Sequence, residues 1–273
     1  MDVTPLSLIA SLPTPSSGPW IARSYPGARR YDAQDLLKHW PRLHDAQCGE
    51  APSPGPLLDG WVHYHNGDFE RAAALGLQHG GADLTLANQA TAVYANYLEP
   101  REGMRQALFR QVAERAAGQV AANPQDWQAL FWQAYALGRY CHAINVARAM
   151  AQGLGGRVKG ALERVIELQP AHADAHIALA SFHADVINKV GALVGRMTYG
   201  VRLETAMELY QRGLELHSAS ANALIEYAHG LVMLFGEARM DEATRLYEQA
   251  VALEPADARS SLDADLARAG LAD

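Results

Sequence analysis

The stretch ATRLYEQAVALEP, residues 243–255, decides the fold because it combines helical spacing with a fixed stop. Ala243, Tyr247 and Ala250 stand at offsets 0, 4 and 7, which is one face of a helix, and Pro255 follows at offset 12. Small residues let a second helix approach closely, an aromatic ring fills the space beside them, and proline ends the hydrogen-bond ladder. The stretch therefore predicts a helix that packs tightly against a partner helix and ends before Pro255.

The same spacing recurs three times upstream. The matching sets are Ala206, Tyr210, Gly213 and Ser218; Val158, Leu162, Val165 and Pro170; and, more weakly, Val112, Ala116, Gln119 and Pro124. Ten residues after each of these three breaks stands a small residue: Ala134, Ala180 and Ala228. This is the pattern of the tetratricopeptide (TPR) repeat, a pair of antiparallel helices. No alternating Val/Ile/Thr pattern predicts a strand. We expect an all-α, TPR-like right-handed superhelix of about four helix pairs.

Two units are longer than the ordinary TPR period of about 34 residues. Pro124 and Pro170 are 46 residues apart, and Pro170 and Ser218 are 48 apart. The excess falls between the first and second helix of each unit, at roughly 139–157 and 185–203, and both insertions are rich in glycine. We expect extended first helices that turn at the glycines, with both insertions emerging on one face of the stack.

Composition excludes several classes of function. The chain has 273 residues, 49% of them hydrophobic, a net charge of −7 and a pI near 5.9. A mildly acidic surface argues against nonspecific nucleic-acid binding and against an anionic membrane as partner. No run reaches the ~20 apolar residues of a membrane span. Residues 1–13 lack the basic start of a secretion signal, and Cys48 and Cys141 match no metal-ligand spacing, so we expect free thiols and a cytoplasmic protein.

The sequence divides into two parts. Residues 1–56 form a Pro- and Gly-rich arm, a short helix with Asp32 as N-cap, and a Pro-rich linker; residues 57–273 form the helical repeat domain. Trp20 and Tyr25 allow part of the arm to pack down, and the arm could occupy the groove of the superhelix as an internal ligand.

Three motifs that suggest chemistry have simpler explanations. His172, His176 and His183 share one helix face, but the last two would lie about 10 Å apart along the axis, so they cannot share a metal ion and are expected in the core. Residues 153–159 (GLGGRVK) lack the full spacing of a phosphate-binding loop. Residues 191–195 (GALVG) predict close helix packing. We expect no catalytic residues, no metal and no cofactor.

The inner groove is the predicted binding surface, because five first-helix positions of each TPR unit face it. In the three best-defined units these are Gln128, Phe131, Tyr135, Gly138 and Arg139; Asp174, Ile177, Ser181, Ala184 and Asp185; and Asn222, Ile225, His229, Val232 and Met233. The lining mixes apolar, aromatic and hydrogen-bonding groups, as binding surfaces do. The alternative is that the insertions fill the groove and these residues are core.

About half of the chain carries a resemblance to known proteins. The residues that carry it include LGRY at 137–140, GGRVK at 155–159, LQP at 168–170 and ADAHIAL at 173–179. From about residue 134 to 265 the chain resembles the atypical TPR domain of the regulator-of-microtubule-dynamics family, and more closely bacterial TPR proteins of unassigned activity. The resemblance implies a helical scaffold with interaction roles and brings no catalytic residues.

The sequence thus favours a non-enzymatic scaffold or adaptor that binds an unknown protein or peptide in its concave groove. A small-molecule carrier or sensor, with the groove closed by the insertions, is the alternative. An enzyme would need convergent polar groups that the sequence does not show. Exposed apolar insertions also leave a homo-oligomer open.

Overall fold

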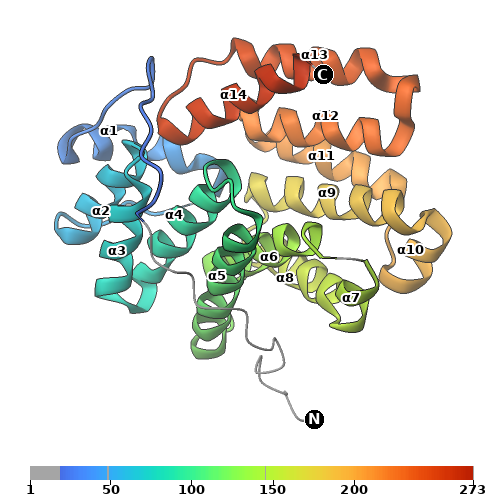
Figure 1. Cartoon of the computed structure of the whole chain (residues 1–273), viewed down its shortest axis with the longest axis horizontal. Coiled ribbons are helices and arrows are strands. Elements are labelled where there is room, and N and C mark those ends of the chain that lie inside the picture. Colours follow the sequence, from blue (N-terminus) through green and yellow to red (C-terminus); the bar gives the residue numbers. More distant parts are fainter. Residues whose placement is uncertain (1–18, 48, 145, 273) are drawn as a thin grey trace.

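The computed structural model describes residues 19–47, 49–144 and 146–272, and every regular element within those ranges is a helix (Figure 1). The all-α prediction is confirmed. Residues 1–18, on which the expectation about a secretion signal rests, and Cys48 lie outside the described residues.

The described helices form five antiparallel pairs and a final single helix, one pair more than the approximate number expected. The pairs are α2 (Pro56–His65) with α3 (Phe69–His79), α4 (Leu84–Tyr97) with α5 (Glu102–Ala122), α6 (Trp127–His142) with α8 (Leu154–Leu168), α9 (Ala173–Val190) with α11 (Leu203–Leu216), and α12 (Ala221–Phe235) with α13 (Met240–Ala252). Helix α1 (Ala33–His44) and the 3-10 turn η2 (Asp45–Gln47) precede them, and α14 (Ala258–Ala272) follows. Two further 3-10 turns are η3 (Gly81–Asp83) and η4 (Gly236–Arg239).

The repeat frame marks the places where helices meet. Ala134, Ala180 and Ala228 are buried, each at most 1% exposed. The second-helix positions of all four frames are buried too: Val112, Ala116 and Gln119; Val158, Leu162 and Val165; Ala206, Tyr210 and Gly213; and Ala243, Tyr247 and Ala250. Small side chains at the crossing points and larger ones beside them let the pairs stack.

Side-chain caps set the starts of several helices. Asp32, Asp68, Asp126 and Ser220 each accept a hydrogen bond from the backbone amide three residues on, which satisfies an amide that has no partner inside the helix. The N-cap expected at Asp32 is confirmed.

The expectation of an extended first helix that turns at a glycine is confirmed for the second insertion and is wrong for the first. Helix α6 ends at His142, and the short helix α7 (Val146–Ala151) follows it. Helix α9 does run on for 18 residues, and the short helix α10 (Ala192–Tyr199) then follows. Glycines with positive φ break the helices: Gly191 (83°) ends α9 and Gly200 (68°) ends α10. Other residues adopt such backbone angles only at a cost in energy, so Gly191 and Gly200 make α10 a separate short helix. Helix α6 ends without a glycine, at the C-cap residue Ala143.

The described part of the arm packs on the first two pairs. Trp20 stacks on Tyr94 of α4, with ring centroids 4.1 Å apart, and Tyr25 meets Phe69 edge-on at 6.4 Å. The Tyr25 ring also covers Gly67, where a Cβ would collide with it. These aromatic residues hold residues 19–31 against α2, α3 and α4.

Figure 1 shows that the succession of pairs bends round until α14 lies beside the N-terminal helices. Helix α14 contacts both α12 and α2, so the last helix of the stack also touches the first pair. In addition to the contact between α14 and α2, Arg23 of the arm forms an ion pair with Asp265 of α14. The described chain is therefore a closed ring of helices rather than an open arc.

Gly230→Ala tests the close approach of α12 to α11. A Cβ at Gly230 would lie 2.4–2.6 Å from ring atoms of Tyr210, which is fully buried. Alanine gains up to ~1 kcal/mol in helix propensity, but steric overlap in a packed core costs ~1–3 kcal/mol. We expect urea unfolding to show a net loss of ~1–2 kcal/mol.

Gly118→Ala is the matched control. Gly118 is exposed on α5, and an added Cβ would meet nothing within 4 Å. This variant should be stabilised by ~0.5–1 kcal/mol. Equal effects of the two substitutions would contradict the packing described at Gly230.

Candidate functional site

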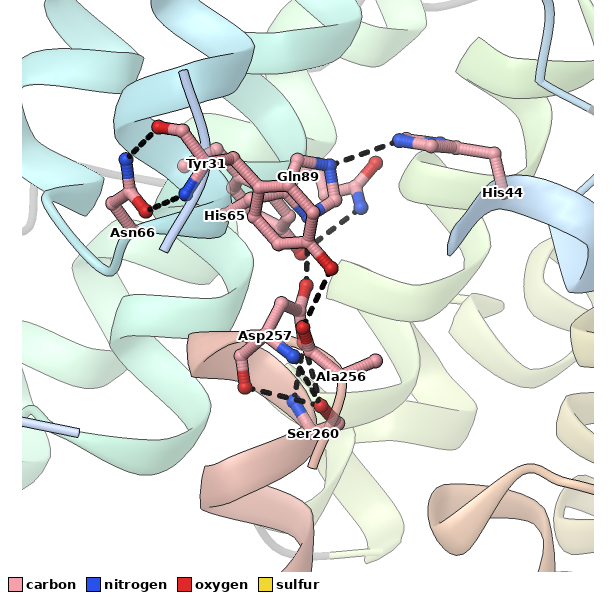
Figure 2. Close-up of polar contacts among 9 residues, drawn as sticks. Tyr31, His44, His65, Asn66, Gln89, Ala256, Asp257 and Ser260 are labelled. Carbon is pink, nitrogen blue, oxygen red and sulfur yellow. Dashed lines mark hydrogen bonds and ion pairs between the residues drawn. The ribbon is translucent and has the colours of Figure 1, made fainter. Parts of the chain in front are cut away.

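The two ends of the ring meet in a buried cluster of polar side chains. His65, the last residue of α2, places its Nδ1 2.7 Å from Oδ2 of Asp257, the residue before α14. The hydroxyl of Tyr31 donates to the carbonyl of Ala256 at 2.7 Å. Figure 2 shows these groups converging, with His44 on the other side of His65. Contacts between residues 192 and 225 positions apart thus join the first pair to the last helix.

The hydrogen bonds place one proton with certainty. Asp257 can only accept, so Nδ1 of His65 carries the proton of their contact; Nε2 of His65 and Nε2 of His44 lie 3.0 Å apart, and one of them donates to the other. Burial and the neighbouring His65 hold the pKa of His44 well below its ordinary value. One chain of hydrogen bonds therefore connects α1, α2 and the start of α14.

Asp257 performs two tasks at once. Burial alone would raise its pKa, but hydrogen bonds from His65 and from the backbone and hydroxyl of Ser260 outweigh burial and lower the pKa to about 2. The amide N and Oγ of Ser260 both lie 2.8 Å from Oδ1 of Asp257, so this carboxylate also caps the first turn of α14. The start of α14 and its contact with α2 depend on the same side chain.

A second polar group lies between α4, α9 and α14. Tyr97 donates to Asp263, and the Gln47 side chain donates to Oδ2 of Asp174 at 2.8 Å. Burial raises the pKa of Asp263 to about 6, although the nearby Arg259 opposes that shift. Burial also disfavours the charge of Arg259, but the surrounding tyrosines and carboxylates raise its pKa well above the ordinary value. Thus η2, rather than the described part of the arm, reaches the inner side of the ring.

Three predicted groove residues, Tyr135, Arg139 and Ser181, make contacts inside the molecule, either with one another or with Glu226. Arg139 of α6 pairs with Glu226 of α12 at 2.7 Å and lies 5.2 Å from the ring centroid of Tyr135. Ser181 of α9 donates to the other carboxylate oxygen of Glu226 at 2.9 Å. Burial disfavours the charge of Glu226, but Arg139 outweighs it and lowers the pKa. The contacts bridge three first helices across the inner face.

The predicted groove residues, taken together, differ in how exposed their side chains are. Asp185 pairs with His142 at 2.8 Å. The buried ones are Phe131, Asp174, Ile177, Ala184 and Ile225. The partly or fully exposed ones are Gln128, Tyr135, Gly138, Arg139, Ser181, Asp185, Asn222, His229, Val232 and Met233. Of these, His229 and Val232 are the most accessible, and both lie on α12.

Sequence reasoning missed Glu226, which the structure places at the centre of these contacts. It stands one position after Ile225, outside the usual groove-facing set. A signal for it exists: Glu226 is the one charged residue in α12, whose sequence is ANALIEYAHGLVMLF. A lone carboxylate in an apolar helix needs a cation beside it once it is partly withdrawn from water, and that cation here is Arg139.

Two cavities flank η2, and Gln47 lines both. One, of about 150 Å³, lies between α1, α2, α4 and α6 and includes the predicted Gln128 and Phe131 in its wall. The other, of about 200 Å³, lies between η2, α12 and α14 and includes Asp174 and Asn222. The closing of the ring thus leaves two separate spaces on the inner side.

The three helix-face histidines are buried, as the sequence predicted. His172 accepts from the amide of Ala175 and so caps α9. His176 lies 3.0 Å from the carbonyl of Pro170, and His183 meets the backbone of Arg202. Among the described residues, no group of three or more His, Cys, Asp or Glu side chains could hold a metal ion.

The two insertion helices, α7 and α10, lie on the same side of the ring (Figure 1), and both carry exposed apolar side chains. Helices α7 and α10 each pack on α8, and the ring of Tyr199 lies against Gly155. We call their exposed apolar residues the insertion ledge: Val146, Met150, Leu193, Val194 and Met197. Leu193 is 73% and Met197 80% exposed, well above other large apolar residues in the described chain. The expected common face is therefore present.

Two other sequence expectations concern cysteine and membranes. Cys141 is a free thiol whose pKa burial raises to about 11. None of the described helices combines the length and the apolar character that crossing a membrane requires.

Stacked helix pairs with small residues at their crossings define this chain as a TPR-like helical-repeat protein. No family model and no curated protein matches it. Among solved structures it is similar to a thermophilic TPR protein from Thermus thermophilus, with a TM-score of 0.55 and 17% identity over 78% of this chain and 97% of the other. This likeness supports the TPR-like fold; the resemblance to the regulator-of-microtubule-dynamics family stays a prediction.

Asp257→Asn tests the closure of the ring. The substitution keeps the shape and the helix cap but removes the charge that His65 faces, and breaking a buried charged contact costs ~3 kcal/mol. The wild-type contribution should be present above the ordinary Asp pKa and be lost as pH falls through about 2, the pKa of Asp257 in the folded protein. Urea unfolding between neutral and acidic pH measures both effects.

Asp265→Asn is the matched control, because Asp265 also joins α14 to the N-terminal part but in an exposed ion pair with Arg23. Its loss should cost less than ~1 kcal/mol. A loss at Asp265 as large as that at Asp257 would contradict the dominant role of the buried contact.

His172→Asn tests the buried cap of α9. Burial lowers the pKa of His172 to about 4, so the unfolded chain takes up a proton first as pH falls below ~6.5. Stability from neutral His172 is therefore full above ~6.5 and falls by roughly 3 kcal/mol as pH drops to the folded pKa. Asparagine caps helices well without titrating. The difference in unfolding free energy between wild type and variant should shrink as pH falls from ~6.5 to the pKa of His172 in the folded protein, about 4. Parallel pH profiles of the two proteins would contradict the role of neutral His172.

Proposed function

We propose that this chain is a non-enzymatic helical-repeat scaffold that binds a partner protein through the insertion ledge. The TPR-like fold supports a scaffold, because stacked pairs present extended surfaces at little cost in stability. The observation that carries the choice of surface is the exposure of Leu193 and Met197 on α10. These two residues are one helical turn apart, and large apolar side chains exposed side by side mark interaction sites.

The charge around the insertion ledge indicates what kind of partner would bind there. Segments 143–160 and 186–203 hold six cations, Arg148, Arg157, Lys159, Lys189, Arg196 and Arg202, and no Asp or Glu. The rest of the chain holds 17 Lys and Arg against 30 Asp and Glu. An apolar strip with flexible methionines and a basic surround fits an amphipathic acidic segment. An anionic membrane fits less well, because the acidic remainder of the chain would be repelled.

The groove residues predicted from sequence are a second candidate surface for the same function. Exposed His229 and the neighbouring Val232 and Met233 support it on α12, and Gln128 supports it at the edge of the smaller cavity. The groove residues that already make contacts within the molecule support it less, because a ligand would have to break the ion pair between Arg139 and Glu226. A substitution at Arg139 would also leave the half-buried Glu226 without its cation, so a loss of binding could not be separated from a loss of stability.

The experiment is a pull-down from source lysate with three variants of equal thermal stability. Leu193→Asp with Met197→Asp should lose the partner, because two carboxylates disrupt the apolar strip and repel an acidic segment. Leu77→Asp, at an exposed leucine on α3 far from the ledge in sequence, should retain it. Rising salt should weaken capture by the wild type.

His229→Ala with Met233→Ala tests the groove in parallel. Loss of the partner in this variant alone would reject the ledge and support the groove. Retention of the partner in all variants would reject both surfaces. Self-association abolished by the ledge variant would identify a second copy of the chain as the partner instead.

A further inference from the structure

The smaller cavity is lined by four tryptophans. It is lined by Trp40 of α1, Trp61 of α2, and Trp127 and Trp132 of α6, four of the five tryptophans in the chain. The fifth, Trp20, lies elsewhere against Tyr94. Its volume of about 150 Å³ is that of a cavity that holds one small organic group.

Each wall is a fixed aromatic cluster. On one side Trp40 stacks on His44 at 3.7 Å and meets Trp61 edge-on at 5.3 Å, and its indole N–H donates to the carbonyl of Gly49 at 2.8 Å. Trp40 and Trp61 are both under 10% exposed. Because hydrogen bonding and stacking hold these rings, the wall is formed before any ligand arrives.

The opposite wall comes from α6 and α9. Phe131 lies 4.7 Å and Trp127 5.5 Å from the ring of His172, and Trp132 packs edge-on against Phe131 at 5.2 Å. His172 is held in turn by its cap of α9. The cavity therefore lies between two preformed sets of rings and is open to solvent where the exposed Glu50 lines it.

The charged residues of the lining are all acidic. They are Glu50, in the linker after η2, and Asp83, before α4; the lining contains no Lys or Arg. The two histidines of the lining, His44 and His172, are uncharged at neutral pH because burial lowers the pKa of each. Aromatic faces are electron-rich, so rings and carboxylates create a negative potential together.

We propose that this cavity binds an organic cation, namely an alkylated ammonium group, either as a free small molecule or on the side chain of a peptide. A quaternary ammonium group matches the aromatic walls by cation–π attraction and the two carboxylates by charge. A neutral apolar group would gain the burial but not the charge interaction. An anion would face both carboxylates without a compensating cation. The site is independent of the proposed ledge.

The first experiment compares choline with 3,3-dimethylbutan-1-ol, its neutral isostere. Trp20→Phe removes the one tryptophan outside the cavity, so intrinsic fluorescence then reports on the cavity alone. Choline should give saturable quenching in the millimolar range or tighter, with affinity at least roughly tenfold above that of the isostere. Choline binding should weaken as salt rises, because Glu50 is exposed and Asp83 partly exposed.

Charge variants test the role of the carboxylates. Glu50→Gln with Asp83→Asn should lower choline affinity by roughly three- to tenfold and leave the isostere unaffected. Both substitutions keep side-chain shape at positions that are not buried, so the fold should be retained, as circular dichroism can verify. Asp59→Asn, at an exposed carboxylate on α2 outside this cavity, is the matched control and should leave choline affinity unchanged.

A trimethyl-lysine peptide and its unmodified counterpart identify the source of the cation. Tighter binding of the trimethyl-lysine peptide than of choline would identify a peptide ligand, and the reverse would identify a small molecule. Equal binding of choline and its neutral isostere, no saturable choline signal, or unchanged choline affinity in the double variant would each overturn the proposal.

Discussion

The contact between His65 and Asp257 is the constraint on which the rest of the structure depends. It joins the first helix pair to the last helix through a buried 2.7 Å hydrogen bond between residues 192 positions apart. The packing of each pair on its neighbours is local, whereas contacts between the two ends turn the curve of the stack into a ring. Tyr31 with Ala256 and Tyr97 with Asp263 share this task with His65 and Asp257. Asp257 differs from the others because the same carboxylate also caps α14.

Closure changes how the inner face can be used. In an open stack the first helices present a continuous groove, but here Arg139 and Ser181 reach Glu226, and Gln47 reaches Asp174. Their polar groups are satisfied within the molecule, and what remains is divided into two cavities on either side of η2. The two most exposed large apolar residues, Leu193 and Met197, lie instead on the second insertion.

The local architecture could be predicted from the sequence because it follows from spacing over a few residues. Small residues such as Ala180 and Ala228 are buried where the repeat frame puts them, and Asp32 caps α1. The closure could not be predicted, because nothing in the spacing relates His65 to Asp257. The cavity of tryptophans was missed for the same reason: its walls come from α1, α2 and α6, which the frame treats separately. The insertions were placed correctly, and α9 turns at a glycine as expected, but nothing in the sequence marked the end of α6 at His142.

A ring that is closed by its two ends has a fixed number of units. Repeat arrays ordinarily gain or lose units with little penalty, since each unit contacts only its neighbours and a terminal cap can be moved along. Here an added or deleted pair would rotate α14 away from α2 and separate Tyr31 from Ala256 as well as His65 from Asp257. Duplication, the usual route by which such proteins lengthen, is therefore closed to this one, and change is confined to the connections within a unit, where both insertions lie.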